Sequence, residues 1–373
     1  MTPRPEPSTR FLRSAQGWPY LLVPFIPAAI ALELAGAPAP AVFFAAALGI
    51  IPTAALMGTS TEELAARSGP GIGGLLNVTF GNAPELIIAL FALSEGLHEV
   101  VKASIIGSVI GNILLVLGAA MLVGGIGREK QNFNETTASV QSLMLFLASA
   151  ALLMPAIFEL SEGRGLPIAG DEIVDYGSDV ERLSVCVAVV LMATYVIGLF
   201  FSLRTHRDLF NPPYQHEDTL GWSVRRSVVM LAIAGAFVGL MSEVLVGSIA
   251  EASESIGLSE FFIGVIVVAI VGNAAEHWVA VLVAHKDKMD LAVNIAIGSG
   301  AQVALFVAPV LVLASFVVGP HPLALVFNGF ELGALFLATI IASFVAHEGE
   351  STWFEGVQLL AVYVVLGVAF FFA

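Results

Sequence analysis

Long apolar stretches follow one another along almost the whole chain, and short polar connections separate them. Several hold roughly 18 or more residues with few charges, which is the length that a helix needs to cross the hydrocarbon core of a bilayer. We count eleven such spans, and the pattern therefore predicts an all-α integral membrane protein. The predicted spans cover residues 17–36, 40–66, 71–95, 101–125, 138–160, 181–203, 224–252, 260–284, 289–316, 322–346 and 353–373.

The composition is that of a membrane-embedded chain. Of the 373 residues, 57% are hydrophobic and only 12% are charged, whereas soluble domains carry about 25% charged residues. The net charge of −15 argues against nucleic-acid binding, which depends on basic patches. The single cysteine, Cys186, cannot form an internal disulfide. The apolar stretch 18–35 is too long for the core of a signal peptide, so we interpret it as the first span.

Basic residues gather on one side of the predicted membrane, as the positive-inside rule requires. With the N-terminus inside, the outer side holds only Lys102, Arg164 and Arg182. The cytoplasmic side holds Arg4, Arg10, Arg13, Arg67, Arg128, Lys130, Arg204, Arg207, Arg225, Arg226, Lys286 and Lys288. An odd number of spans then places the C-terminus outside.

An internal repeat links the two halves of the chain. Residues 81–85 (Gly-Asn-Ala-Pro-Glu) recur at 272–276 as Gly-Asn-Ala-Ala-Glu, at an offset of 191 residues. The same offset carries 106–108 (Ile-Gly-Ser) onto 297–299. The first copy lies in a span that runs outward and the second in a span that runs inward, so the repeats are inverted. Inverted repeats with interrupted helices near the midplane are typical of secondary transporters.

The repeat divides the chain into four parts. Residues 1–36 form an N-terminal segment with the first helix, and 37–203 form the first transporter repeat. Residues 204–223 form a cytoplasmic connecting segment, and 224–373 form the second repeat.

Two glutamates lie about halfway along their predicted spans, Glu85 and Glu276. A carboxylate inside the membrane is energetically expensive and marks a functional site by default. Asn82 and Asn273 each precede a glutamate by three residues and share its helix face. Carboxylate and amide oxygens are the ligands that Ca²⁺ prefers, and two carboxylates neutralise one divalent ion.

The backbone and the following helices offer further polar groups. Pro84 cannot donate a hydrogen bond and kinks its helix, while Gly81 and Gly272 weaken the helix beside each motif, so freed carbonyls can face a cation. The next spans add two pairs that each lie about one helical turn apart and can face the same site: Ser108 with Asn112, and Ser299 with Gln302.

The same carboxylates suit proton coupling. Two carboxylates that face each other in a low dielectric repel, so without the cation at least one takes up protons readily. Ca²⁺ then expels protons and protons expel Ca²⁺, which together with alternating access gives antiport. His277 follows Glu276 directly; it is either a proton carrier or site hydrogen-bond partner, or a structural residue. Three further glutamates are either interfacial or functional: Glu62, Glu243 and Glu251.

The two Gly-Asn-Ala-x-Glu motifs resemble those of the calcium/proton exchanger (CAX-type) branch of the calcium/cation antiporter superfamily. Similar stretches cover almost the whole chain after the first span: 61–65, 73–82, 203–206, 272–277, 287–291, 298–306 and 348–356. The family often carries an acidic segment between its halves. Here residues 206–222 hold only Asp208, Glu217 and Asp218, so regulation by such a segment is not carried over.

The resemblance implies a separate first helix followed by two inverted five-helix halves. It implies that Glu85 and Glu276 bind Ca²⁺, surrounded by Asn82, Asn273 and nearby carbonyls. It also implies supporting roles for Glu62, Ser108, Glu243, His277, Ser299 and Gln302.

The resulting prediction is a secondary transporter rather than an enzyme, with Ca²⁺ as transported substrate, H⁺ as counter-ion and no cofactor. We expect a prokaryotic cytoplasmic membrane, with Ca²⁺ leaving the cell. Sodium-driven exchange is the first alternative, although Asn and Ala stand where sodium-driven relatives tend to place Ser or Thr. An intramembrane metalloenzyme lacks a His-Glu-x-x-His pattern, and a passive channel favours a symmetric pore. The range of cations (Mn²⁺, Na⁺, K⁺), the proton stoichiometry and assembly into a homo-oligomer stay open.

Overall fold

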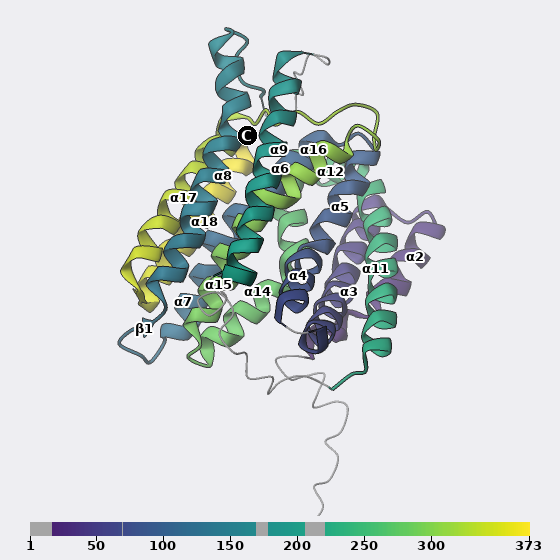
Figure 1. The fold of residues 1–373 in the computed structure, drawn as a ribbon. Helices are drawn as coiled ribbons and strands as arrows, with labels where there is room; N and C mark the ends of the chain where they lie inside the picture. The colour runs from purple at the N-terminus through teal and green to yellow at the C-terminus, as the bar shows by residue number, and fades with distance from the viewer. Residues whose placement is uncertain (1–16, 69, 169–177, 206–220) are drawn as a thin grey trace, which may run out of the picture.

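Helices of membrane-spanning length make up most of the structure (Figure 1). The computed structural model describes residues 17–68, 70–168, 178–205 and 221–373. Within these ranges, nine helices are long and apolar enough to cross a membrane, and the bent pair Leu75–Gly81 and Ala83–Ser94 forms a tenth if it counts as one span. The remaining apolar helix, Trp18–Leu34, is shorter. The all-α membrane architecture is confirmed, whereas eleven full-length spans are not.

The elements follow the predicted order of the two repeats. The first half contains η1 (Trp18–Leu22), α2 (Phe25–Leu34), α3 (Ala39–Ser68), α4 (Pro70–Gly81), α5 (Ala83–Ser94), α6 (His98–Ile110), η2 (Gly111–Val116), α7 (Leu117–Gly125), β1 (Gln131–Asn132), α8 (Glu135–Ser161), α9 (Asp179–Phe200) and η3 (Phe201–Thr205). The second half contains α11 (Val224–Gly247), α12 (Ile249–Ile256), α13 (Glu260–Phe262), η4 (Ile263–Val268), α14 (Ala269–His285), α15 (Met289–Gln302), η5 (Val303–Val307), α16 (Ala308–Ala314), α17 (Gly329–Glu348), β2 (Glu350–Ser351) and α18 (Trp353–Phe372). The two short strands pair antiparallel and join the halves, with Gln131 opposite Ser351.

The predicted span 322–346 begins too early. Its helix, α17, starts at Gly329 because Asn328 and Glu331 form a capping box that ends the preceding segment. Leu323–Phe327 is buried but belongs to no helix or strand, and its backbone bonds to other segments. The N–H of Leu325, for example, donates to Ser184 Oγ at 3.0 Å. An apolar run therefore does not always mean a helix.

The predicted span 224–252 is also wrong at its far end. The helix breaks at Ser248, between α11 and α12. The hydroxyl of Ser248 donates to the carbonyls of Val244 and Leu245 at 2.9 and 2.8 Å, and such bonds compete with the helical ladder.

Local backbone features recur at the same offset of 191 residues as the motifs. The π-helical turn η2 maps onto residues 302–307, which nearly coincide with the π-helical η5. The turn after α5 holds Gly96 at φ 77°, and the turn after α14 holds Asp287 at φ 60° in the equivalent position. The repeat is therefore visible in the backbone, while the predicted domain boundaries stay predictions.

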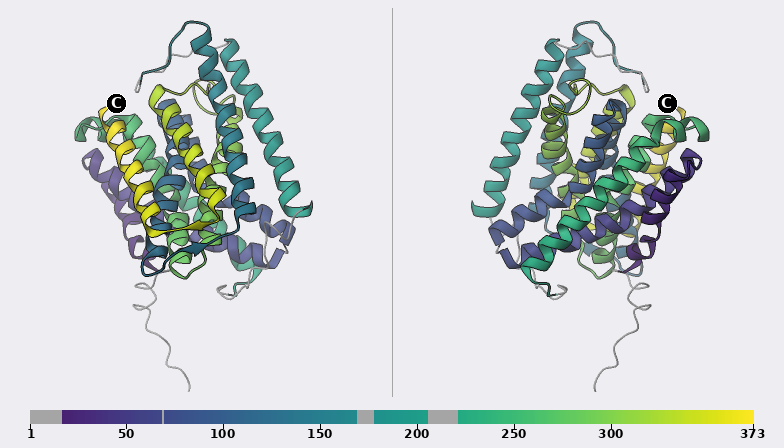
Figure 2. Two further views of the ribbon diagram at one scale, coloured as in Figure 1. Left: turned by 90° about the vertical axis from the view of Figure 1, so that its left-hand side faces the viewer. Right: turned by 90° about the vertical axis from the view of Figure 1, so that its right-hand side faces the viewer.

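α6 lies at the centre of the bundle, with every residue from Val100 to Ile110 buried. It approaches η4 so closely that a Cβ on Gly107 would lie 2.1 Å from the carbonyl oxygen of Val265. Small residues allow this kind of contact between membrane helices, and here the contact places Ser108 beside α14. α3 and α11 run side by side, tilted across the other helices (Figure 2).

The two ends of the bundle carry different polar groups. β1 lies at one end and the C-terminus at the other (Figure 1). Arg128, just before β1, pairs with Asp287 at 3.5 Å, and Arg164, past α8, lies 3.8 Å from Glu159. These residues fall on opposite sides, as the charge distribution predicts. Arg4, Arg10, Arg13, Arg207 and most of the connecting segment 204–223 lie outside the described residues.

Lys102 departs from its predicted position at the outer end of the span 101–125. α6 begins at His98, earlier than predicted, so Lys102 is 1% exposed within the helix. Its Nζ lies 3.3 Å from the carbonyl oxygen of Val326 and 3.6 Å from Glu99 Oε1. These partners offset part of the cost of burying a charge.

Candidate functional site

The two Gly-Asn-Ala-x-Glu motifs cross each other in the middle of the bundle. A Cβ on Gly81 would lie 3.1 Å from Glu276 Oε1, and a Cβ on Gly272 would lie 3.1 Å from Glu85 Cγ. Each motif glycine thus makes room for the glutamate of the other repeat. The two carboxyl groups lie within electrostatic range of each other.

Each motif asparagine is anchored through its amide nitrogen to a helix of the opposite repeat. Asn82 Nδ2 donates to Gln302 Oε1 at 2.6 Å. Asn273 Nδ2 donates to Ser108 Oγ at 3.1 Å and to the carbonyl of Ala269 at 3.0 Å. Both amides are 1% exposed. Because the nitrogens are engaged, the amide oxygens are left for another partner.

The two glutamates differ in their hydrogen bonds. Ser299 Oγ donates to Glu276 Oε2 at 2.7 Å. Within the described residues, neither carboxyl oxygen of Glu85 has a hydrogen-bond partner, although the residue is only 8% exposed.

Four buried oxygens at this crossing therefore lack partners in the part of the chain that the structure describes: Oε1 and Oε2 of Glu85, and Oδ1 of Asn82 and of Asn273. Leaving a buried polar group unsatisfied costs about 1–3 kcal/mol, and more for a charged group. All four are hard oxygen ligands, the kind that Ca²⁺ and related cations bind. The chemistry that fits this arrangement is cation coordination.

The helix geometry differs between the two motifs. The first coincides with the break between α4 and α5, which are bent by 41° at Asn82, with Pro84 in the first turn of α5. The second lies within α14, which runs through Gly272 without interruption, while the irregular backbone precedes it in η4. The expected weakening at both glycines is therefore seen beside Gly81 alone.

The remaining predicted residues lie at different distances from the crossing. Asn112 is 0% exposed in η2, and neither its Nδ2 nor its Oδ1 has a hydrogen-bond partner among the described residues. His277 Nε2 is likewise buried without a partner there. Glu62 is exposed near the end of α3, within electrostatic range of Glu276.

Two acidic residues of the seventh predicted span are not brought to the site by any hydrogen bond or ion pair among the described residues. Glu243 is exposed on α11, and Glu251 is exposed on α12. Glu331 is buried, but it caps the start of its own helix, and the backbone N–H of Asn328 donates to its Oε2 at 2.8 Å.

Gln141 of α8 was not among the predicted site residues. A Cβ on Gly298 would lie 3.3 Å from Gln141 Nε2, so this amide reaches α15 next to Ser299. Its Oε1 is buried, with no hydrogen-bond partner in the described ranges. The available signal was a lone amide inside an apolar span.

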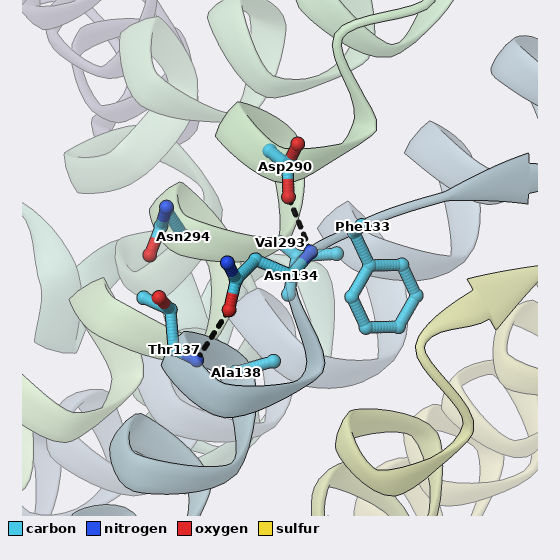
Figure 3. A pocket seen from close by; sticks show the side chains of 7 residues that line it. All are labelled: Phe133, Asn134, Thr137, Ala138, Asp290, Val293 and Asn294. Atoms are coloured by element: carbon cyan, nitrogen blue, oxygen red, sulfur yellow. Dashed lines mark hydrogen bonds between the residues drawn. The ribbon is translucent and has the colours of Figure 1, made fainter. Parts of the chain in front are cut away.

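Other parts of the described structure offer no stronger metal site. Within these residues, no three His, Cys, Asp or Glu side chains converge into a cluster. A shallow pocket lies at the start of α8 and α15, lined by residues that include Asn134, Thr137 and Asp290 (Figure 3). Its carboxylate already accepts a hydrogen bond from the backbone N–H of Asn134.

Residues 38–204 and 226–372 match the model of the sodium/calcium exchanger protein family. The chain belongs to this family. The exchanger-family match thus spans both repeats and leaves out little more than the first helix and the connecting segment.

Two relatives are similar to this chain over nearly the full length of both proteins. It is 42% identical over 372 residues to a Ca²⁺/H⁺ antiporter from Synechocystis sp., covering 94% of this chain and 96% of the relative. It is 41% identical over 351 residues to the Ca²⁺/H⁺ antiporter ChaA from Bacillus subtilis, covering 93% and 96%.

Solved structures share the fold. The structure of native YfkE matches with a TM-score of 0.81 and 38% identity, covering 95% of this chain and 100% of YfkE. The crystal structure of the H⁺/Ca²⁺ exchanger CAX matches with a TM-score of 0.70, covering 96% and 92%. Its identity of 13% supports the fold alone. The calcium/proton exchanger resemblance is therefore confirmed, and the chain is a multi-pass membrane protein.

Proposed function

We propose that this protein is a secondary antiporter that exchanges Ca²⁺ for H⁺ by alternating access. The cation and the protons compete for one site, formed where Glu85 and Glu276 meet. Ca²⁺ is the transported substrate and H⁺ the counter-ion, with no resident cofactor. The names of the similar proteins from Synechocystis sp. and Bacillus subtilis support the pair of ions.

The observation that carries the proposal is the crossing of the two motifs. Two carboxylates from opposite repeats neutralise one divalent cation, and the amide oxygens of Asn82 and Asn273 add two neutral ligands. Ca²⁺ takes six to eight oxygens, so carbonyls beside Gly81 and water complete the shell. Without the cation, the charges of Glu85 and Glu276 repel, and protons take its place.

The surrounding residues have supporting roles. Ser299 and Gln302 hold one carboxylate and one amide in place, and Ser108 holds the other amide. His277 lies beside Glu276 and carries or shares a proton. Glu62 attracts cations toward the site through its exposed charge.

The proposed orientation follows from the basic residues. The end that carries Arg128, Lys130 and the α14–α15 turn faces the cytoplasm. The N-terminus is then inside and the C-terminus outside, in the cytoplasmic membrane, and an outside excess of protons drives Ca²⁺ out of the cell.

The test is radiolabelled Ca²⁺ flux in proteoliposomes under an imposed proton gradient, with Na⁺ absent. We expect Glu85→Gln and Glu276→Gln each to abolish exchange while the protein stays folded, because either change removes half of the charge that balances the cation. Glu251→Gln, on the surface of α12, is the matched control and keeps parental flux. Full transport by either site variant contradicts the proposed site.

Sodium-driven exchange is the competing function, since the matching family includes sodium/calcium exchangers by name. The same vesicles distinguish the two. Uptake that requires a sodium gradient and ignores the proton gradient would replace H⁺ by Na⁺ in the proposal.

A further inference from the structure

The two helical hairpins that carry the site are matched in length. In the α14–α15 hairpin, Glu276 lies 11 residues before Asp287 and Ser299 lies 12 residues after it. Asp287 therefore stands at the apex, and the conformation of this turn sets how α14 and α15 face each other at the site. The α5–α6 hairpin has the same spacing around Gly96.

The two apices share a backbone conformation but not a residue type. Gly96 has φ 77° and Asp287 has φ 60°. Glycine adopts this left-handed conformation freely, whereas other residues do so uncommonly and at a cost. Among the described residues, Asp287 is the only non-glycine with positive φ. A side chain kept at such a position points to a role for that side chain.

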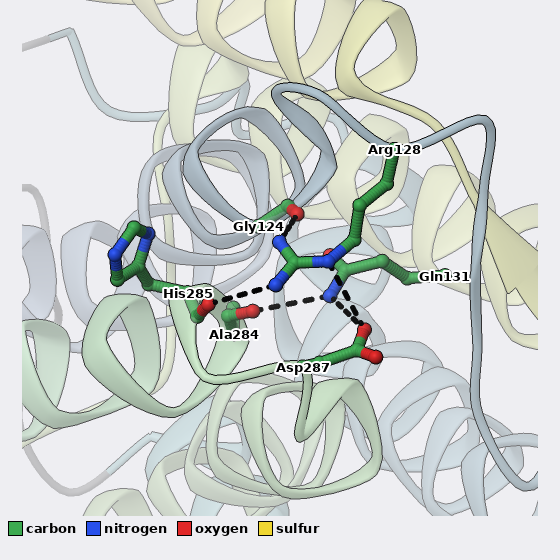
Figure 4. Close-up of polar contacts among 6 residues, drawn as sticks. All are labelled: Gly124, Arg128, Gln131, Ala284, His285 and Asp287. Carbon is green, nitrogen blue, oxygen red and sulfur yellow. Dashed lines mark hydrogen bonds and ion pairs between the residues drawn. The ribbon is translucent and has the colours of Figure 1, made fainter.

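The carboxylate of Asp287 is held by two side chains of the first repeat. Gln131 Nε2 donates to its Oδ1 at 3.0 Å, and Arg128 Nε lies 3.5 Å from the same atom (Figure 4). Both residues belong to the connection between α7 and α8.

The same two side chains also cap the end of α14. Gln131 Nε2 donates to the carbonyl of Ala284 at 3.1 Å, and Arg128 Nη2 donates to that of His285 at 3.1 Å. Terminal carbonyls of a helix need such partners. We call Arg128, Gln131 and Asp287 the apex clamp.

Gly96 has no counterpart of the apex clamp, because it has no side chain. A Cβ there would instead lie 3.0 Å from Cγ of Pro320, an apolar contact. The hydrogen bonds to the two site glutamates also differ between the two hairpins. The clamped hairpin contains the bond between Ser299 and Glu276, whereas in the other hairpin the oxygens of Glu85 have no partner among the described residues.

We propose that Asp287 is a positioning residue for the cation site. Its carboxylate, held by Arg128 and Gln131, fixes the turn and with it the register of α14 against α15. The bond between Ser299 and Glu276 depends on that register. Glu276 is then the fixed carboxylate of the pair, and Glu85 is the one that moves to close on the cation. This inference rests on the proposed function.

Two substitutions separate positioning from general stability. Asp287→Gly keeps the left-handed turn and relieves its strain, so the protein stays folded, but it removes the clamp. Asp287→Asn keeps an oxygen that can accept from Gln131 and loses the charge. Glu350→Gln is the matched control, because it removes an ion pair with Lys130 in the same region without touching the α14–α15 turn.

The measurements are KM for Ca²⁺ and maximal rate in proteoliposomes, together with the Ca²⁺ concentration that half-maximally stabilises the purified protein against heat. We expect Asp287→Gly to raise KM about tenfold, the size of effect expected when a hydrogen bond to a charged group is no longer held. Its maximal rate changes less than about twofold, since Glu85 and Glu276 are intact. Asp287→Asn raises KM less, and Glu350→Gln leaves it unchanged.

The outcomes distinguish this inference from the proposed function. A parental KM in Asp287→Gly overturns the role of Asp287, whatever its thermal stability. A larger KM in Asp287→Asn than in Asp287→Gly also overturns it. If the parent protein transports no Ca²⁺, the proposed antiport is refuted instead. In that case the thermal measurement still tests the apex clamp: equal half-stabilising Ca²⁺ concentrations for the parent and Asp287→Gly contradict it.

Discussion

Replacing Ser299 by alanine removes the only hydrogen bond that a described side chain donates to the carboxylate of Glu276. The matched change is Ser108→Ala, at the position related by the repeat. Ser108 accepts from the amide of Asn273 at 3.1 Å and, among the described residues, has no hydrogen bond to a carboxylate. The two serines are similarly buried and differ in the charge of their partner, so their variants isolate the effect of that charge.

The length of this hydrogen bond indicates how large the effect of Ser299→Ala should be. The distance from Ser299 Oγ to Glu276 Oε2 is 2.7 Å, which is typical of an O–H donor on a charged carboxylate. A hydrogen bond to a charged group contributes about 1.5–3 kcal/mol, and about 1.36 kcal/mol corresponds to one pH unit. The bond favours the deprotonated carboxylate, so without it protons compete with Ca²⁺ up to a higher pH. We expect the pH midpoint of Ca²⁺ binding to rise by about one to two units in Ser299→Ala.

The neutral bond of Ser108 contributes only about 0.5–1.5 kcal/mol and has no titrating partner. Ser108→Ala should therefore weaken Ca²⁺ binding by at most about tenfold without moving its pH midpoint.

The assay is equilibrium binding of radiolabelled Ca²⁺ to the purified protein across a pH series, repeated as uptake into proteoliposomes. An unshifted midpoint in Ser299→Ala would refute the reasoning. Equal upward shifts in Ser299→Ala and Ser108→Ala would do so too, because they would show that the charge of the partner does not matter.

Three further predictions test the packing around the site and the polar ends of the bundle. Gly272→Ala should impair transport, because its Cβ would lie 3.1 Å from the glutamate of the other repeat, whereas Gly333→Ala, with no described atom within 4 Å, should transport normally in the same flux assay. Lys102→Met should destabilise the protein by about 3–5 kcal/mol, the usual loss when one partner of a buried pair is removed, seen as a lower melting temperature; an unchanged value would show that the ammonium is not needed. The hydrogen bond from Lys130 to Glu350 raises the pKa of Lys130 above its usual 10.5. The pair therefore contributes its full stability below pH 10.5, and this contribution is lost as the pH rises through the raised pKa of Lys130. The melting temperatures of the parent and Glu350→Gln should accordingly converge at strongly alkaline pH, and a difference that grows there would contradict the ion pair.

Most of the membrane architecture could be predicted from apolar run length, because a spanning helix must satisfy its backbone internally and be long enough to cross. The prediction failed where this link breaks. Leu323–Phe327 is as apolar as a helix core, yet it is not helical, and the carbonyl of Val326 and the N–H of Leu325 bond to other helices. Composition cannot distinguish a buried segment without regular secondary structure from a helix when the hydrogen-bond partners of its backbone are distant in sequence.

The candidate site was predictable as a set of residues rather than as a set of bonds. The offset of 191 residues pointed to Glu85, Glu276 and their asparagines, because a polar motif seldom recurs inside apolar sequence by chance. The clamp around Asp287 could not be predicted, since a charged residue in a turn carries no signal of its own. Its positive φ and its partner Arg128, 159 positions earlier, appear only in the fold.

Strict symmetry between the repeats would predict the wrong hydrogen bonds, and one pair of positions shows why. Position 302 holds glutamine, but its counterpart in the first repeat is Gly111, which has no side chain and no described atom within 4 Å of the place where a Cβ would lie. Asn82 donates to Gln302, while Ser299 donates to the carboxylate of Glu276. Asn273 has no such amide at the equivalent position and donates instead to Ser108 of the first repeat, and the oxygens of Glu85 have no hydrogen-bond partner among the described residues. The difference between Gly111 and Gln302 thus gives the two motif asparagines different partners, at a site built from matching motifs.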